Sequence, residues 1–290
     1  MQIPPIAYRD LPSYDDFAHE FLFPHRPVII TGALSPWKAL TTWTPAYFAQ
    51  RFSDRRLSID GREYTVAGFV QRVESSSPQS PAPYLRNLVL SQLFPELVED
   101  ISPLPQYVSP NWLEGRAARL LESRVHSGSP ELYIGGRGGK FPFLHFDLYH
   151  THAFLMQIYG VKEYTAFSED QTPFLYVSPT QNNASSIPDI EHPDLQRYPL
   201  FARATPLRFL LRPGEMLFIP GGLWHTARML TPSITISVNR ANASNWVQLR
   251  ADLVERAPLP VKPLAAAYLS ALALVHSITD RIHTAGVASR

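Results

Sequence analysis

The spacing of apolar and polar residues changes near residue 130, and this change divides the predicted elements into two groups. Before it, spacing and capping residues predict short helices at 14–23, 45–49, 87–97 and 111–122, and a buried strand at 27–31. Thr44 and Pro45 mark one helix start, because threonine caps a helix and proline suits its first position. A Ser- and Pro-rich stretch at 75–83 is typical of a flexible surface loop.

After residue 130 the apolar residues fall in short β-rich runs that Gly, Pro or polar turns separate. The runs are 131–134, 142–148, 153–159, 163–167, 207–211, 215–219, 224–229 and 233–238. About eight short strands with such turns are typical of a double-sheet jelly roll. We therefore predict a mainly β fold with flanking helices: a double-stranded β-helix (jelly-roll, cupin-like) core at about 130–240, N-terminal α/β elements and a C-terminal helical segment.

The C-terminal segment is more apolar than a lone surface helix needs. Its helical pattern at 263–283 is strongly apolar on one side. We expect residues 1–256 to form the main domain and 257–290 a helical extension, which either packs on the barrel or forms a homodimer interface. Its longest apolar run, 264–275, is predicted to be too short to span a bilayer, and the N-terminus lacks signal-peptide features. A cytoplasmic protein without a membrane partner is expected.

Charge and cysteine content narrow the chemistry. Lys+Arg 26 against Asp+Glu 25 gives a net charge of +1, so neither nucleic acid nor an anionic membrane is expected as the main partner. The basic residues between 51 and 62 alternate with acidic ones, which favours a solvated face. Because the chain has no cysteine, disulfides and thiolate metal sites are excluded, and a metal would need His, Asp or Glu.

One short motif has the spacing of metal ligands. In a strand, side chains two apart point to the same face, so His145 and Asp147 can reach one metal, and His225 after the 215–219 strand supplies a third ligand. Two histidines and one carboxylate leave three coordination positions open, which suits non-haem Fe(II). Zinc, nickel and manganese stay open as alternatives, and His150 and His152 lie close enough to compete as ligands.

Several blocks in the same order resemble the Jumonji-C (JmjC, cupin-like) Fe(II)- and 2-oxoglutarate-dependent oxygenases, small hydroxylase branch. The blocks are 26–32, 84–97, 145–162, 189–201, 213–225 and 234–239, so the resemblance covers roughly 26–245. It implies that the three ligands above hold Fe(II). It also implies that Lys162 and Tyr84 bind the distal carboxylate of the co-substrate 2-oxoglutarate, that Asn239 lines the pocket near its metal-bound end, and that O2 is the oxidant.

Two positions depart from the family pattern. Pro142 stands where a Ser or Thr that contacts 2-oxoglutarate is common, and an Asn usual after the aspartate is absent. Thr151 or His152 is a hypothetical substitute for the missing contact.

The substrate is inferred from what the chain lacks. Without cysteine-rich reader modules it resembles the small hydroxylases, which act on protein side chains, tRNA or small molecules, and the near-neutral charge argues against tRNA. We predict a dioxygenase that hydroxylates a peptide or protein side chain, with Tyr149, His150 and Trp224 as candidate substrate contacts. A hydroxylase of a small metabolite or tRNA, a zinc or manganese isomerase and a non-catalytic cupin-like binding protein are the alternatives.

Overall fold

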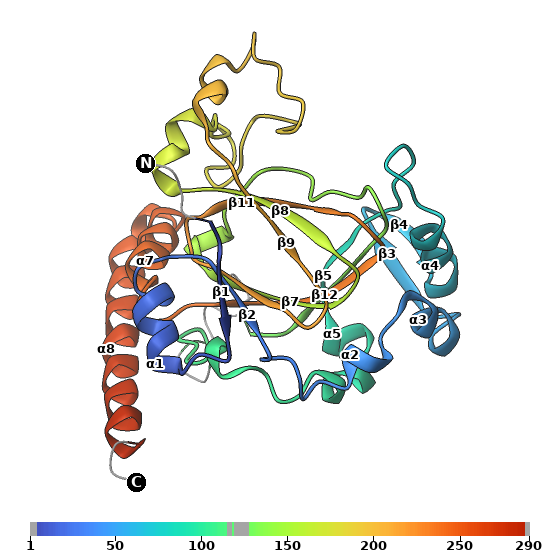
Figure 1. Ribbon diagram of the computed structural model, residues 1–290. Helices are drawn as coiled ribbons and strands as arrows, with labels where there is room; N and C mark the ends of the chain where they lie inside the picture. The colour runs from blue at the N-terminus through green and yellow to red at the C-terminus, as the bar shows by residue number, and fades with distance from the viewer. Residues whose placement is uncertain (1–4, 115–117, 119–127, 288–290) are drawn as a thin grey trace.

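Two facing β-sheets form the centre of the molecule. The computed structural model describes residues 5–114, 118 and 128–287 (Figure 1). The larger sheet has the order β1-β2-β10-β7-β12-β6-β5 and the smaller β11-β8-β9. Their strands are β1 (Ala7–Asp10), β2 (Val28–Thr31), β5 (Leu85–Val89), β6 (Glu131–Gly135), β7 (His152–Tyr159), β8 (Lys162–Phe167), β9 (Leu207–Leu211), β10 (Met216–Ile219), β11 (Trp224–Met229) and β12 (Ser233–Arg240). The predicted cupin-like, mainly β core with flanking helices is confirmed.

The alternation of side chains in β12 shows how the larger sheet is used on both faces. Ile234, Ile236 and Val238 belong to the largest apolar cluster, together with Phe17 and Phe48 from the N-terminal helices. The residues between them, such as Thr235 and Ser237, are polar and still buried. They face the space between the two sheets, so one face of this sheet is an apolar core and the other has a polar strip inside the barrel.

Short helices from the first third of the chain cover the apolar face. They are α1 (Tyr14–Phe17), a π-helix (Ala18–Leu22), α2 (Ala39–Thr42), α3 (Pro45–Arg51), α4 (Val66–Glu74) and α5 (Leu90–Leu93). The Thr44 hydroxyl accepts a hydrogen bond from the backbone N–H of Tyr47, as predicted for the start of α3. With the hairpin β3 (Arg56–Ile59) and β4 (Arg62–Thr65), α3 and α4 lie at the opposite end of the barrel from the C-terminus (Figure 1).

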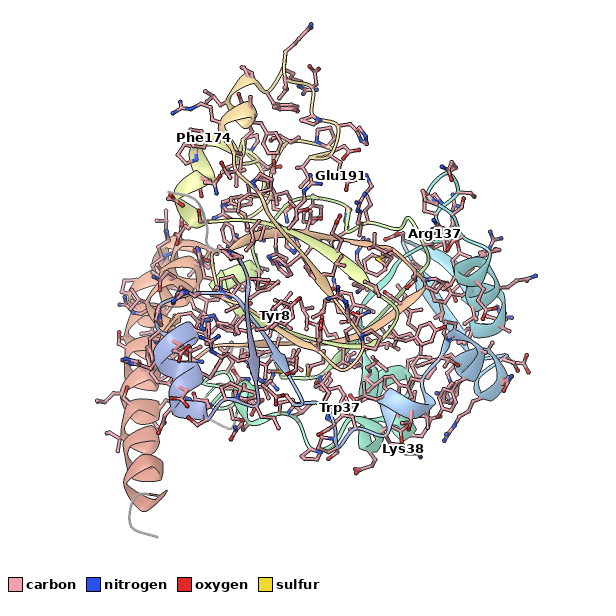
Figure 2. The ribbon with its side chains drawn as sticks, in the orientation of Figure 1. Tyr8, Trp37, Lys38, Arg137, Phe174 and Glu191 are labelled. Carbon is pink, nitrogen blue, oxygen red and sulfur yellow. The ribbon has the colours of Figure 1, made fainter. Side chains whose placement is uncertain are left out.

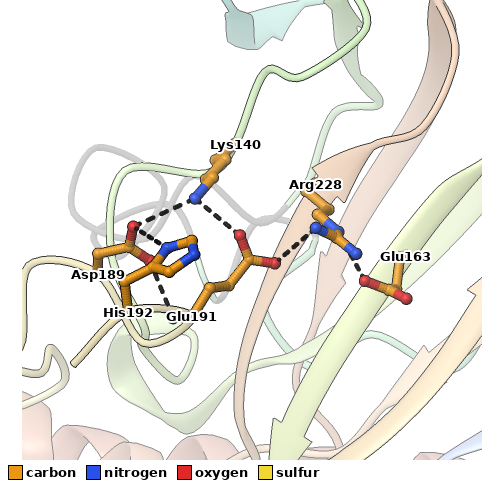
Figure 3. A network of polar contacts seen from close by, with 6 residues as sticks. All are labelled: Lys140, Glu163, Asp189, Glu191, His192 and Arg228. Atoms are coloured by element: carbon orange, nitrogen blue, oxygen red, sulfur yellow. Dashed lines mark hydrogen bonds and ion pairs between the residues drawn. The ribbon is translucent and has the colours of Figure 1, made fainter. Parts of the chain in front are cut away.

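Residues 168–206, here called the projecting segment, extend beyond the smaller sheet, and Phe174 and Glu191 lie on them (Figure 2). A network of ion pairs ties the segment to the barrel (Figure 3). Glu191 lies 2.8 Å from Lys140 and 3.0 Å from Arg228, and Arg228 in turn pairs with Glu163 of β8 at 2.6 Å. The segment is therefore fixed close to the residues that follow Lys140, which include His145 and Asp147.

Two predicted elements differ from the structure, and a third lies mostly outside the described residues. The predicted helix at 87–97 begins as strand β5, continues as α5 and ends in a 3-10 helix (Pro95–Ile101), because residues 85–89 pair with β6. The predicted strand at 142–148 is irregular apart from single bridges at His145, and a 3-10 helix (Leu148–His150) ends it. Most of the predicted helix at 111–122 lies outside the described residues.

The remaining 3-10 helices span Gln106–Val108, Glu169–Phe174, Pro199–Arg203 and Leu259–Val261. The sequence reading also missed β1 and the β3–β4 hairpin. The hairpin turn is Asp60-Gly61, with φ of 49° and 77°, a pair that favours two-residue hairpins and was available as a signal.

The chain ends in α7 (Trp246–Glu255) and α8 (Lys262–Val287), which run along one side of the barrel (Figure 1). Leu269 and Leu272 of α8 are buried against the α7 cluster, whereas Leu264 and Leu274 are 73% and 64% exposed. Among the described residues, Leu259–Ile278 is the one stretch long and apolar enough to cross a membrane by length and composition. The length argument made for residues 264–275 is therefore wrong, because the helix extends the apolar run on both sides.

The homodimer interface, one of the two alternatives for the C-terminal helix, can be tested by making the exposed face of α8 polar. Replacing Leu264 and Leu274 together with glutamate should shift sedimentation velocity from dimer to monomer, because both side chains are exposed and the fold does not need them. The far-UV circular dichroism spectrum should be unchanged, because the fold of the protomer does not need these two side chains. A monomeric wild-type protein at every concentration would contradict the prediction.

Candidate metal centre and co-substrate pocket

Backbone pairing brings two of the predicted metal ligands together. The N–H of His145 donates to the carbonyl of His225 at 3.0 Å, and the N–H of His225 donates to the carbonyl of His145 at 2.6 Å. Asp147 follows two residues later, and one ligand atom from each of the three side chains lies within 4.8 Å of the others. Residues 80 positions apart thus form one cluster, although the predicted regular strand around His145 is absent.

The atoms in this cluster lack the partners that buried polar atoms normally have. His145 Nδ1 and Asp147 Oδ2 are buried without a hydrogen-bond partner, and Asp147 Oδ2 lies 3.8 Å from His225 Nε2. Burial, and then the nearby His225, hold the pKa of His145 well below its usual value, so the ring is neutral and free to ligate. Burial raises the pKa of Asp147, a shift that a bound cation would reverse.

Neighbouring groups fix the orientation of the three side chains. His225 Nδ1 lies 3.0 Å from the Leu223 carbonyl, a hydrogen bond that leaves Nε2 directed at the cluster. Asn239 donates to Asp147 Oδ1 at 3.3 Å, and the Phe141 ring stacks on the His145 ring with centroids 4.3 Å apart. Two imidazoles and one carboxylate, each held by a second group, fit an octahedral divalent metal such as Fe(II) with one face open.

A buried lysine lies in the same barrel. Lys162 begins β8, is 2% exposed, and its ammonium donates to the Tyr84 hydroxyl at 3.1 Å. None of the ion pairs among the described residues involves Lys162, and burial alone lowers its pKa from 10.5 to about 7. A buried cation without a counter-ion is costly, so the pocket is suited to an anionic ligand. Burial also raises the pKa of Tyr84, which keeps its phenol protonated and able to donate.

Two adjoining cavities meet at the metal ligands. The inner pocket is lined by Lys162, Tyr84, Tyr164 and Ser237 as well as the ligands. The outer cavity, of about 540 Å³, is bounded by β5, β6, residues 148–151 and residues 181–183. His145, Asp147, Phe141 and Tyr133 line both, so a ligand in the inner pocket and one in the outer cavity would meet at the metal.

The other predicted site residues are divided between these cavities and the core. Asn239 lines the outer cavity and not the inner pocket. Its side-chain amide donates to the carboxylate of Asp147 and, at 3.1 Å, to the hydroxyl of Thr151. Tyr149 also lines the outer cavity. Trp224, by contrast, is buried in an apolar cluster, and His150 pairs with Asp252 at 2.7 Å.

The two proposed substitutes for Pro142 also differ in position. His152 is fully buried, donates to or accepts from the Ser244 hydroxyl at 2.7 Å, and burial lowers its pKa to about 3. It therefore serves the fold and is not available as a co-substrate contact. Thr151 lines the outer cavity, whereas Pro142 lines a different pocket together with Lys140 and Asp189.

Sequence reading missed several cavity residues, among them Glu131, Tyr133, Ser237 and Asn183. For the first three a signal exists: β6 and β12 alternate apolar with polar residues, and a jelly roll directs one face of each strand inward. The alternation predicts strands, but it does not show that the polar residues of these strands face the inside of the barrel. Asn183 comes from the projecting segment, and its amide donates to the Phe146 carbonyl at 2.8 Å.

The cost of burying Lys162 can be measured directly. Because the folded pKa is lowered, the unfolded chain holds this proton more tightly, so the lysine destabilises the ligand-free fold below pH 10.5 and most strongly below about pH 7. Lys162→Met should raise the melting temperature by a few degrees, about 2–4 °C for each kcal/mol gained. The gain should be larger at pH 6 than at pH 9. Scanning calorimetry of both proteins checks this, and a destabilised variant at pH 6 would contradict it.

Comparison with known proteins agrees with this geometry. The model of the protein family described as a cupin-like domain matches residues 14–241 of this chain. Lysine-specific demethylase 8 of Xenopus tropicalis is 30% identical over 238 residues, which cover 78% of this chain and 50% of the relative. Lysine-specific demethylase 8 of Danio rerio is 31% identical over 241 residues, which cover 78% of this chain and 56% of the relative. Arginine-specific demethylase JMJ20 of Arabidopsis thaliana is 26% identical over 267 residues, which cover 81% of this chain and 57% of the relative. The chain spans about half the length of these curated relatives.

Proposed function

The chain belongs to the cupin-like JmjC family, whose oxygenases use Fe(II), 2-oxoglutarate and O2, and from this premise we propose that it is a dioxygenase that hydroxylates a peptide or protein side chain. His145, Asp147 and His225 would hold the iron. Lys162 and Tyr84 would bind the distal carboxylate of 2-oxoglutarate.

One observation carries the proposal: the ammonium of Lys162, which has a hydrogen-bond partner but no counter-ion among the described residues, lines the same pocket as the three proposed metal ligands. A ligand that satisfies both must be an anion at one end and a metal chelator at the other. 2-Oxoglutarate has a carboxylate at one end and an adjacent keto and carboxylate oxygen pair at the other. A metal-dependent isomerase has no need of such a carboxylate clamp, so the lysine favours the oxygenase over that alternative.

The chemistry belongs to the bound groups, and the protein contributes placement. When bound, they supply an oxidation in which one oxygen atom of O2 enters succinate as 2-oxoglutarate loses CO2, and the other converts a substrate C–H bond to C–OH. Tyr84 and Lys162 set the depth of the co-substrate. Asn239 prevents Asp147 from rotating, and the His225–Leu223 hydrogen bond keeps one nitrogen directed at the metal.

The choice of a peptide or protein substrate is supported by the outer cavity and by the relatives. A cavity of about 540 Å³ beside the ligands is large enough for one side chain and part of its backbone. The relatives named lysine- or arginine-specific demethylases carry, in those names, amino-acid side chains as their targets. A small metabolite or an RNA would be revealed as the substrate by product analysis.

The test of the cofactor chemistry needs no substrate. Fe(II) and 2-oxoglutarate are added anaerobically to the metal-free protein, and the visible metal-to-ligand charge-transfer band is recorded. We expect a saturable band in the wild type and none in His145→Ala. Lys162→Met should need at least tenfold more 2-oxoglutarate, because a charge-assisted contact is lost. Tyr84→Phe should show a smaller increase.

The control is a variant remote from the pocket, Glu99→Gln, whose side chain is exposed. Its band should match the wild type. A folded wild-type protein that binds iron without producing the band would contradict the proposal and favour a cupin-like binding protein.

A further inference from the structure

Glu131 lies on the polar, inward face of β6, where it opens on the outer cavity. Its neighbours in the strand, Leu132 and Ile134, belong to the apolar core on the other face. The wall of this cavity among the described residues includes no lysine or arginine. Apart from the metal ligand Asp147, Glu131 is the one acidic residue on that wall.

One hydrogen bond, from Tyr133, holds the Glu131 carboxylate through one of its oxygens. The Tyr133 hydroxyl lies 3.0 Å from Glu131 Oε2 and 2.5 Å from the side-chain amide of Asn87. Both partners are acceptors, Asn87 Oδ1 and Glu131 Oε2, so they share the one proton of the Tyr133 hydroxyl. Asn87 thus holds the Tyr133 hydroxyl beside Glu131 Oε2, and Glu131 Oε1 has no hydrogen-bond partner among the described residues.

The backbone at Asn87 is shaped for this contact. Asn87 has a φ of 56°, a left-handed conformation that asparagine tolerates better than most residues. The pairing of β5 with β6 shifts register between Leu85 and Leu88, which places Asn87 in a bulge beside Tyr133. The support of the carboxylate thus comes from a specific irregularity in the sheet edge.

The carboxylate also lacks a cation. Burial raises the pKa of Glu131 to about 7, the hydrogen bond from Tyr133 lowers it and the charge of Asp147 raises it, and no positive group contributes. A cation that entered the cavity would relieve this cost and keep the glutamate ionised. The hydrogen bond from Tyr133 involves one oxygen of Glu131, and the other oxygen is available to a ligand in the cavity that Glu131 lines.

Resting on the proposed function, we propose that Glu131 is the specificity-determining residue of the outer cavity and that it binds the positively charged end of an arginine or lysine side chain. The Tyr133–Asn87 pair positions the carboxylate. The Asn183 side-chain oxygen, which has no hydrogen-bond partner, and the Gln181 amide line the same cavity and can bind the rest of the side chain and its backbone. Neutral side chains of the same length would leave the half-buried carboxylate without a partner.

The test compares two pairs of peptides that differ in charge and little in shape. Gly-Gly-Arg-Gly-Gly amide is compared with its citrulline counterpart, and Gly-Gly-Lys-Gly-Gly amide with its norleucine counterpart. Binding at millimolar peptide is followed by ligand-observed NMR on the full chain loaded with Zn(II) and 2-oxoglutarate, so that no turnover occurs. We expect at least one cationic peptide to bind tenfold or more tightly than its neutral partner.

Glu131→Gln separates the charge from the positioning role. Glutamine still accepts the Tyr133 hydrogen bond but has no charge, so the preference for the cationic peptide should fall to within twofold of unity. Glu99→Gln, an exposed glutamate outside the cavity, should keep the full preference.

Two outcomes overturn the inference. One is equal binding, or no binding, of charged and neutral peptides to protein that has bound 2-oxoglutarate. The other is a charge preference that survives in Glu131→Gln. The affinity for 2-oxoglutarate, measured on the same samples, keeps this result distinct from a failure of the proposed function: protein that does not bind 2-oxoglutarate contradicts the latter.

Discussion

The ammonium group of Lys162, buried in the barrel with a phenol as its hydrogen-bond partner, is the constraint around which the site is arranged. A folded protein gains nothing from a buried cation without a counter-ion. The presence of Lys162 is explained if a bound ligand supplies the negative charge that the protein does not. The inner pocket provides what such a ligand needs: the donor pair Lys162 and Tyr84, and three side chains that could hold a metal ion. We infer that Lys162 lowers the stability of the ligand-free fold and makes the pocket selective for an anionic ligand.

The two-faced larger sheet makes this polar interior possible. Its apolar face packs on the N-terminal helices, so the inward face of β6 and β12 is free to carry Glu131, Tyr133, Ser237 and Asn239. The backbone bridge between His145 and His225 joins the segment before β7 to β11, and the ion pairs of Glu191 hold the projecting segment beside it. The inner pocket and the outer cavity therefore share one wall, at the point where the proposed co-substrate and substrate would meet.

The sequence was sufficient for the parts of this arrangement that depend on local pattern. Strand periodicity predicted β2 and β6 to β12, and the Thr44 cap predicted α3, because these signals lie within a few residues. The motif spacing named the three ligands, and the family resemblance named Lys162 and Tyr84, which the structure brings to one pocket. The role of Glu131 could not be predicted, since it depends on Asn87, 44 positions earlier, and on a bulge that no local pattern marks. The positions of His150 and Trp224 could not be predicted for the same reason, because His150 pairs with Asp252 and Trp224 donates to Thr172, both distant in the sequence.

The most direct test of the central claim is the number of protons that accompany 2-oxoglutarate binding. Calorimetric titrations at pH 8, on protein already loaded with Mn(II), are run in buffers of different ionisation enthalpy. At that pH the lysine of the free pocket is mostly neutral, because its pKa is about 7. A carboxylate beside it raises that pKa, so binding should take up close to one proton. Proton uptake near one that disappears in Lys162→Met is the predicted result. Tight binding without proton uptake would show that Lys162 is not the group that waits for the co-substrate's charge.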